Sequence, residues 1–281
     1  MTLRDLLELP APVLALAPMQ DVTDLPFWTL MTRYGGADLY FTEYFRVTAH
    51  YRPERGILES ITRNPTGRPV VAQMIGNDPE ALARTARELE RHPVAGIDLN
   101  LGCPAPVVYR KCAGGGLLRD PARIDNLLAT LRGAVSGPFT VKTRVGFGDA
   151  REFEQLLDVF SRHSLDLLTV HGRTVAGKYS SAVDLGPIAR AVDRLPFPVL
   201  ANGNVWTADD ALCVLAETKA RGLMIGRGAV RNPWIFSQIR DRLAGRPPAR
   251  PSGARSRNTE SCSFVVLTSS RTSGIRTNMS S

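Results

Sequence analysis

The chain has 281 residues, 43% of them hydrophobic, and a formal net charge of +8 at neutral pH. This apolar fraction supports a globular core, while the absence of any run of 18 apolar residues argues against a membrane span. The N-terminus lacks the basic start and apolar stretch of a signal peptide, so we expect a cytoplasmic protein with free thiols. The positive charge favours a polyanionic partner such as nucleic acid, although six arginines of residues 246–281 contribute to it.

Short β-rich apolar runs alternate with amphipathic helical patterns along most of the chain. The runs predict strands at 13–19, 38–44, 69–76, 96–100, 138–146, 166–172, 198–203 and 222–228. The intervening patterns predict helices at 78–91, 120–135, 152–163, 185–195, 207–218 and 232–243. Eight strands, each followed by a crossover, indicate an α/β fold of the eightfold β/α (TIM) barrel type over residues 1–245. A doubly wound sheet is the alternative, but no glycine fingerprint follows the first strand.

Residues 246–281 have a different composition, rich in Ser, Arg, Thr, Pro and Gly and almost without amphipathic periodicity. Such a segment buries too little apolar area to offset its conformational entropy. We therefore expect a disordered, low-complexity tail after the barrel.

Polar side chains stand at or just after the ends of the predicted strands: Gln20, Glu43, Gln73, Asn100, Lys142, Arg144, His171, Asn202 and Arg227. Active sites of β/α barrels lie at the C-terminal ends of the strands, so we expect these groups to converge around a polar, anionic ligand. Gln73 would suit a flavin or pyrimidine edge, or a neighbouring strand. For His171, a ligand contact, an acid and a satisfied structural histidine all remain open.

Lys142 lies within the predicted strand TVKTRV, where alternation places Lys142 and Arg144 on one face. An unpaired ammonium inside a barrel is costly, so Lys142 needs an anionic or electron-rich partner. We favour a functional partner over a structural pair with Asp98 or Glu43.

Two glycine-bearing turns, Asn202-Gly203-Asn204 and Gly226-Arg227-Gly228, follow the seventh and eighth predicted strands. Loops at these positions of β/α barrels often bind phosphate through backbone N–H groups, and Arg227 could add a charged contact. Together the turns predict a phosphate-bearing cofactor.

Of the four cysteines, only Cys103 stands at a predicted strand end, on a Gly-Cys-Pro turn before a glycine-rich segment (113–116). We expect a functional thiol there, with a mobile loop beside it. Cys112 and Cys213 are interpreted as structural, Cys213 as filler in the core. No cysteine belongs to a C-x-x-C pair or a histidine cluster, and we expect no metal site.

The motifs APMQDVTD, VAQMIG, DLNLGCP, GGGLLRDP, VKTRVG, VHGRT, ANGNV and MIGRGA occur in one order and spacing. In this respect residues 12–243 resemble the tRNA-dihydrouridine synthases, flavin-dependent enzymes with an eightfold barrel. The resemblance implies FMN as cofactor, NADPH as reductant and tRNA as substrate. It also implies a set of FMN contacts: Ala17, Pro18, Met19, Gln73 and Lys142 at the ring, His171 at the flavin or its phosphate, and Asn202, Gly203, Asn204, Gly226 and Arg227 at the phosphate.

The same resemblance implies that Cys103 is the catalytic proton donor and that Asn100 and Arg144 face the substrate base. Reduced FMN would pass hydride to one carbon of the uracil 5,6 double bond, and Cys103 would protonate the other. A free thiol is mostly protonated at neutral pH, as an acid must be. The uridine would have to swing out of the folded RNA, and the glycine segment could close over it.

Members of the family continue past the barrel into a helical RNA-binding domain, which we expect to be missing here. Three hypotheses stay open: a tRNA uridine reductase, an FMN barrel acting on a free pyrimidine in the manner of dihydroorotate dehydrogenases, and a flavin-binding remnant without tRNA activity. We favour the first and expect a monomer.

Overall fold

The computed structural model describes residues 1–248, so the predicted tail lies almost wholly outside the described part of the chain. Eight strands form a closed parallel barrel in which each strand pairs with the next and the last pairs with the first. The predicted TIM barrel is therefore confirmed. Its strands are β1 (Val13–Leu16), β2 (Leu39–Phe41), β4 (Val70–Ile75), β5 (Gly96–Leu101), β6 (Phe139–Arg144), β7 (Leu167–His171), β8 (Val199–Asn202) and β9 (Gly222–Ile225).

The second predicted strand is interrupted. Its first part, β2, pairs Phe41 with Val71 of β4, and a further short strand, β3 (Phe45–Arg46), pairs Phe45 with Met74 of the same strand. Four steps along the interrupted strand thus oppose three along β4, which is the count of a β-bulge. A bulge re-aims the side chains beside it, and it brings Tyr44 to the wall of the cavity described below.

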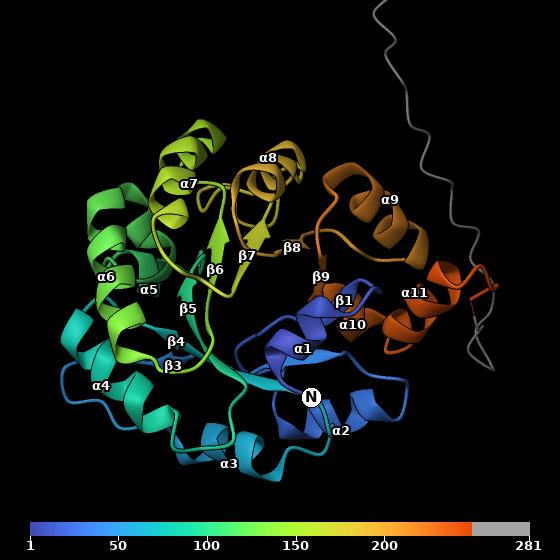
Figure 1. Ribbon diagram of the computed structural model, residues 1–281, viewed down its shortest axis with the longest axis horizontal. Helices are drawn as coiled ribbons and strands as arrows, with labels where there is room; N and C mark the ends of the chain where they lie inside the picture. Colours follow the sequence, from blue (N-terminus) through green and yellow to red (C-terminus); the bar gives the residue numbers. More distant parts are fainter. Residues whose placement is uncertain (249–281) are drawn as a thin grey trace, which may run out of the picture. The chain divides into compact units, whose positions relative to one another are not determined.

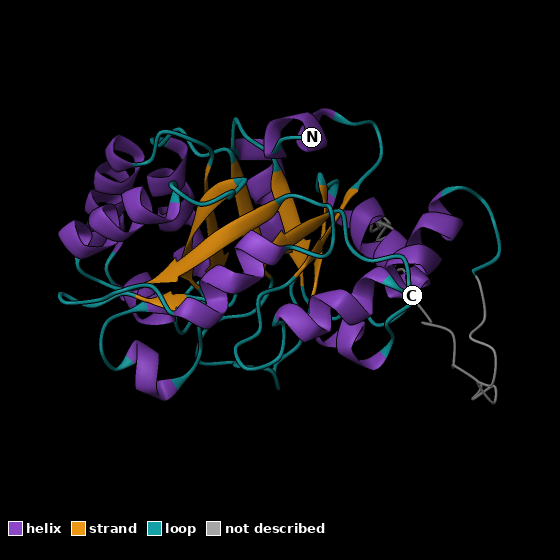
Figure 2. Cartoon of the chain, turned by 90° about the horizontal axis from the view of Figure 1, so that it is seen from below, coloured by secondary structure: helices purple, strands orange, loops and turns teal. Residues whose placement is uncertain are grey.

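Helices surround the strands (Figures 1 and 2). All six predicted helices are present: α4 (Pro79–Leu89), α6 (Pro121–Ala134), α7 (Phe153–Ser161), α8 (Gly186–Arg194), α9 (Ala208–Thr218) and α11 (Ile235–Leu243). An aspartate followed by a proline, a common helix start, occurs at residues 78–79 and 120–121, and the carboxylates of Asp78 and Asp120 cap α4 and α6. The sequence pattern did not predict α1 (Leu3–Glu8), α2 (Leu25–Thr32), α3 (Arg55–Arg63), α5 (Pro106–Tyr109), α10 (Arg227–Arg231) and the 3₁₀ turns η1 (Gly114–Arg119) and η2 (Ala150–Glu152).

Helix α1 closes one end of the barrel. Its buried side chains Leu3, Leu6 and Leu7 share an apolar cluster with residues near the N-terminal ends of the strands, among them Val13 and Val71. The Arg221 guanidinium holds the segment after the helix by donating to the carbonyls of Leu7 (2.7 Å) and Ala11 (2.8 Å). Within the described residues, α1 therefore covers the N-terminal ends of the strands. Among the described residues, no helix is long and apolar enough to cross a membrane.

Candidate functional site

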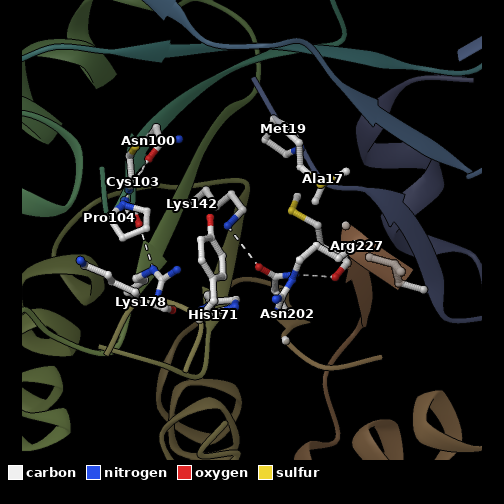
Figure 3. A pocket seen from close by; sticks show the side chains of 18 of the residues that line it. Ala17, Met19, Asn100, Cys103, Pro104, Lys142, His171, Lys178, Asn202 and Arg227 are labelled. Carbon is white, nitrogen blue, oxygen red and sulfur yellow. Dashed lines mark hydrogen bonds between the residues drawn. The ribbon is translucent and has the colours of Figure 1, made fainter. Parts of the chain in front are cut away.

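A cavity of about 620 Å³ opens at the C-terminal ends of the strands. It has the size of a small-molecule or cofactor site. Of the fourteen residues to which the family resemblance assigns a role, thirteen line it: Ala17, Pro18, Met19, Asn100, Cys103, Lys142, Arg144, His171, Asn202, Gly203, Asn204, Gly226 and Arg227. Figure 3 shows Cys103 and Asn100 on one side of the cavity, Ala17 and Met19 on another, and Lys142 between them.

The Cys103 thiol follows the end of β5 and is half-buried in the cavity wall. The side-chain oxygen of Asn100 accepts hydrogen bonds from the backbone N–H groups of Gly102 and Cys103, each at 3.0 Å. The Asn100 amide nitrogen donates to Gln73 Oε1 at 2.8 Å. Asn100 thus fixes the turn that carries the thiol, and both ends of its amide are engaged within the protein.

The glycines after Cys103 do not form a free loop, and this part of the prediction is wrong. Gly114, Gly115 and Gly116 are buried in η1, and the Gly115 N–H donates to the Cys103 carbonyl (3.2 Å). A Cβ on Gly115 would lie 2.8 Å from the Cys103 oxygen, and a Cβ on Gly116 would lie 2.4 Å from the Tyr109 oxygen. Glycine is needed here because the backbone packs directly against the turn beneath Cys103.

The Lys142 ammonium points into the cavity and donates to Asn202 Oδ1 at 3.2 Å. Within the described residues it forms no ion pair with Asp98 or Glu43, the structural alternative. Burial, with a further contribution from the nearby Arg144 charge, lowers the pKa of Lys142 to about 8. Lys142 is therefore a buried cation that still carries most of its charge at neutral pH.

The two glycine turns lie at the ends of β8 and β9, as predicted. The backbone of Gly203 has a φ of +133°, a conformation that favours glycine. A Cβ on Gly226 would lie 3.2 Å from Met19 Sδ and 3.3 Å from Ala17 Cβ. Bare backbone thus faces the cavity where the sequence predicts a phosphate.

Arg227 begins α10, and its guanidinium lies between two aromatic rings, 4.8 Å from the Tyr179 centroid and 5.1 Å from that of Trp206. Tyr179 follows β7, Trp206 follows β8 and Arg227 follows β9, so these contacts connect the three loops. Within the described residues Arg227 has no carboxylate partner, so its charge is available to an anion.

His171 is buried at the end of β7, and its Nδ1 atom has no hydrogen-bond partner within the described residues. Burial first, and then the charges of Lys142, Arg144, Arg173 and Arg227, holds the pKa of His171 far below its usual range. The imidazole is therefore neutral at physiological pH. A neutral ring with a free nitrogen among four cations is a site that favours an anionic ligand with hydrogen-bonding groups.

Arg144 is buried and bridges loops of the mouth. Its guanidinium donates to the carbonyl oxygens of Gly102 (2.9 Å), Thr174 (2.9 Å) and Lys178 (2.7 Å). It therefore connects the Cys103 turn to the loop after β7, in addition to lining the cavity.

Glu43, which the sequence also placed around the ligand, does not line the cavity, and neither does Gln73. Gln73 is fully buried behind Asn100, and its amide nitrogen donates to Asp98 Oδ2 at 2.8 Å. The carboxylate of Asp98 and the amides of Gln73 and Asn100 form one connected series of hydrogen bonds.

Sequence reasoning missed several residues of the cavity wall: Tyr44, Lys178, Tyr179, Val205, Trp206 and Met224. Trp206 stands two residues after the predicted turn Asn202–Asn204, so proximity to that motif was an available signal. Tyr179 lies in a loop without secondary structure of its own, and no local pattern marks it.

The interpretation of Cys213 as a core residue is wrong. Cys112 and Cys213 are both exposed. Cys213 lies on α9 within an apolar run, but its position on the helix faces away from the barrel, so it does not fill the core. Within the described residues no group of His, Cys, Asp and Glu is arranged to hold a metal ion.

The fold and the cavity define a TIM-barrel protein with a cation-lined, thiol-bearing cavity at the C-terminal ends of its strands. A family model described as dihydrouridine synthase (Dus) matches residues 15–266. The chain belongs to this family of enzymes.

Curated relatives are similar over most of the chain. The tRNA-dihydrouridine(16) synthase of Ralstonia nicotianae is 37% identical over 242 residues, which cover 83% of this chain and 74% of the relative. The tRNA-dihydrouridine synthase B of Pasteurella multocida is 34% identical over 223 residues, which cover 79% and 67% of the two chains. A probable tRNA-dihydrouridine synthase 1 of Synechocystis is 33% identical, with 79% and 63% covered.

Proposed function

We propose that this chain is a tRNA-dihydrouridine synthase that reduces the 5,6 double bond of uridine in tRNA, with FMN as cofactor and NADPH as reductant. The observation that carries the proposal is the single cavity in which the Cys103 thiol, the Lys142 ammonium and the bare-backbone turns at Gly203 and Gly226 meet. Family membership supplies the reaction class, and the cavity supplies residues suited to each part of it.

The residues of the cavity fit a flavin mononucleotide. The backbone and apolar side chains of Ala17, Pro18 and Met19 offer a surface for a flat ring system. Lys142 offers a positive charge to an electron-rich ring edge, and the free Nδ1 of His171 offers a hydrogen bond. Arg227 and the glycine turns offer charge and backbone N–H groups to a phosphate.

Bound FMN, once reduced by NADPH, would supply the hydride for one carbon of the uracil double bond. Cys103 then has one task, which is to hold a proton on Sγ and give it to the other carbon. Asn100 and the buried glycines fix the backbone of the Cys103 turn. They thereby restrict the thiol to one position at the cavity wall. Lys142 and Arg144 keep the surroundings cationic, which favours the negative charge that develops on the ring before protonation.

A uridine within folded tRNA must leave its stack to reach this cavity. Two exposed cations, Lys178 and Arg227, line the opening, and Arg231 lies 5.2 Å from the ring centroid of Trp206 in the cavity wall. None of the three has a carboxylate partner within the described residues. Such charges attract RNA phosphates at low and moderate salt. The exposed ring of Tyr179 adds a face on which a base could stack.

The proposal is tested by incubating the full chain with FMN, NADPH and tRNA that lacks dihydrouridine. We expect dihydrouridine to appear in the tRNA and NADPH oxidation to depend on it. Free uridine and orotate serve as controls. Orotate-dependent turnover without tRNA-dependent turnover would replace the proposal by a small-molecule oxidoreductase, and FMN binding without either would reduce it to a flavin-binding protein.

A further inference from the structure

A buried carboxylate lies behind the cavity and has no part in the mechanism described so far. Asp98 is fully buried on β5, next to Gln73 on β4 and Thr140 on β6 in the strand register. Its Oδ2 accepts from Gln73 Nε2 (2.8 Å), and its Oδ1 accepts from Thr140 Oγ1 (2.5 Å). Burying a carboxylate is expensive, so its presence here calls for a reason beyond packing.

Hydrogen bonds connect Asp98 to the catalytic turn without a gap. Gln73 Oε1 accepts from the Asn100 amide nitrogen (2.8 Å), and Asn100 Oδ1 accepts from the N–H groups of Gly102 and Cys103 (3.0 Å each). Gln73 is completely buried and Asn100 is only 8% exposed, so water does not compete for these bonds.

The groups at the two ends of this hydrogen-bond series determine which atom of each amide donates and which accepts. Backbone N–H groups at the Cys103 turn require the oxygen of Asn100, which turns its nitrogen toward Gln73. Gln73 must then present its oxygen to Asn100 and its nitrogen to residue 98. An ionised carboxylate only accepts hydrogen bonds. Asp98 can therefore accept from the Gln73 amide nitrogen but could not donate to the Gln73 oxygen.

At neutral pH, Asp98 is mostly in its ionised form, which can only accept hydrogen bonds. Burial raises the pKa of Asp98 to about 6, while the bonds from Thr140 and Gln73 and the charge of Lys142 act to lower it. The carboxylate is therefore mostly ionised at neutral pH. Lys142 lies two residues beyond Thr140 on the same face of β6.

We propose that Asp98 is a positioning residue that fixes the Cys103 turn through Gln73 and Asn100. The inference rests on the proposed role of Cys103 as proton donor. It assigns Gln73 and Asn100 a structural task besides any contact with cofactor or substrate. It also explains why a barrel wall that is apolar on one side of these strands carries an acid, two amides and a hydroxyl on the other.

The test compares Asp98→Leu with Asp98→Asn. Leucine has no acceptor, so the Gln73 amide loses its anchor, whereas asparagine can still accept from Gln73 through its oxygen. We expect Asp98→Leu to lower kcat ~10-fold or more with KM for tRNA and FMN binding little changed, and Asp98→Asn to stay within about threefold of the natural chain. Equal losses in both variants would overturn the proposal, because the charge rather than the acceptor would then matter.

A second measurement does not depend on turnover. Alkylation of each cysteine by iodoacetamide, followed by peptide mass spectrometry without FMN, reports the exposure of the Cys103 thiol, with Cys213 on α9 as the internal reference. We expect the Cys103-to-Cys213 rate ratio to rise at least threefold in Asp98→Leu and to stay unchanged in Asp98→Asn. An unchanged ratio in a folded Asp98→Leu chain would mean that Asp98 does not act on Cys103.

Gln73→Met breaks the same series of hydrogen bonds at the residue between Asp98 and Asn100. It tests whether this series positions Cys103 if Asp98→Leu does not fold. It should raise the alkylation ratio similarly, and adding Asp98→Leu should cause no further change, because both act through one path. Additive effects would overturn the inference. If the natural chain does not reduce uridine, the proposed function fails while the alkylation measurements still test the positioning of the turn.

Discussion

The two ends of the barrel are built from the same strands and differ in nearly every other respect. At the N-terminal end, inward side chains such as Val13 and Val71 join Leu3 and Leu6 of α1 in a closed apolar cluster. At the C-terminal end, inward side chains such as Lys142 are polar and surround an open cavity. One end can therefore be altered to change stability, and the other to change chemistry.

The largest effect is expected for Cys103→Ala at the open end. The change removes the proposed proton donor, so kcat for uridine reduction should fall by ~10² to 10⁴-fold. FMN content and melting temperature should stay close to those of the natural chain, because the thiol is only half-buried. Turnover and flavin absorbance are measured on the same preparation, and full activity of the alanine variant would remove the thiol from the mechanism.

The matching change at the closed end is Leu6→Ala. Leu6 is 2% exposed, and its truncation leaves a cavity beneath the barrel, so unfolding free energy should fall by about 2–5 kcal/mol. Chemical denaturation measures this loss. Leu9→Ala, which alters a side chain that is 45% exposed just after the same helix, is the control and should cost under about 0.5 kcal/mol. A large change in turnover per folded molecule of Leu6→Ala would show that the two ends are coupled.

A pH effect is expected at Lys142. Because its pKa is lowered to about 8, the ammonium is present below that pH and is lost above it. FMN affinity should therefore be highest below about pH 8 and weaken as pH rises further. Lys142→Met should bind FMN more weakly and remove this pH dependence, which flavin fluorescence titration measures. The same slope in both proteins would assign the dependence to another group.

The smallest effect is expected for Cys213→Ser. An exposed side chain on α9 contributes little, so unfolding free energy should change by less than about 0.5 kcal/mol. The natural Cys213 should also react with a thiol reagent in the folded protein. Resistance to the reagent until unfolding would restore the original interpretation of a core residue.

Much of the molecule could be predicted from sequence because local rules determined it. Alternation placed Lys142 on the inner face of β6, and Asp78 with Pro79 gave the start of α4. The order of strands then placed the strand ends at one rim, since parallel strands of a barrel share one direction.

The sequence by itself thus determined the barrel, the rim and most residues of the cavity, because periodicity and strand order are carried by neighbours along the chain. Only the tertiary structure decided what touches across the barrel. It packed Gly115 against the Cys103 turn, turned Cys213 outward, placed Arg227 between Tyr179 and Trp206, and joined Asp98 to the Cys103 turn through Gln73 and Asn100. These contacts join segments far apart in sequence, and their distances depend on how the strands close into a ring.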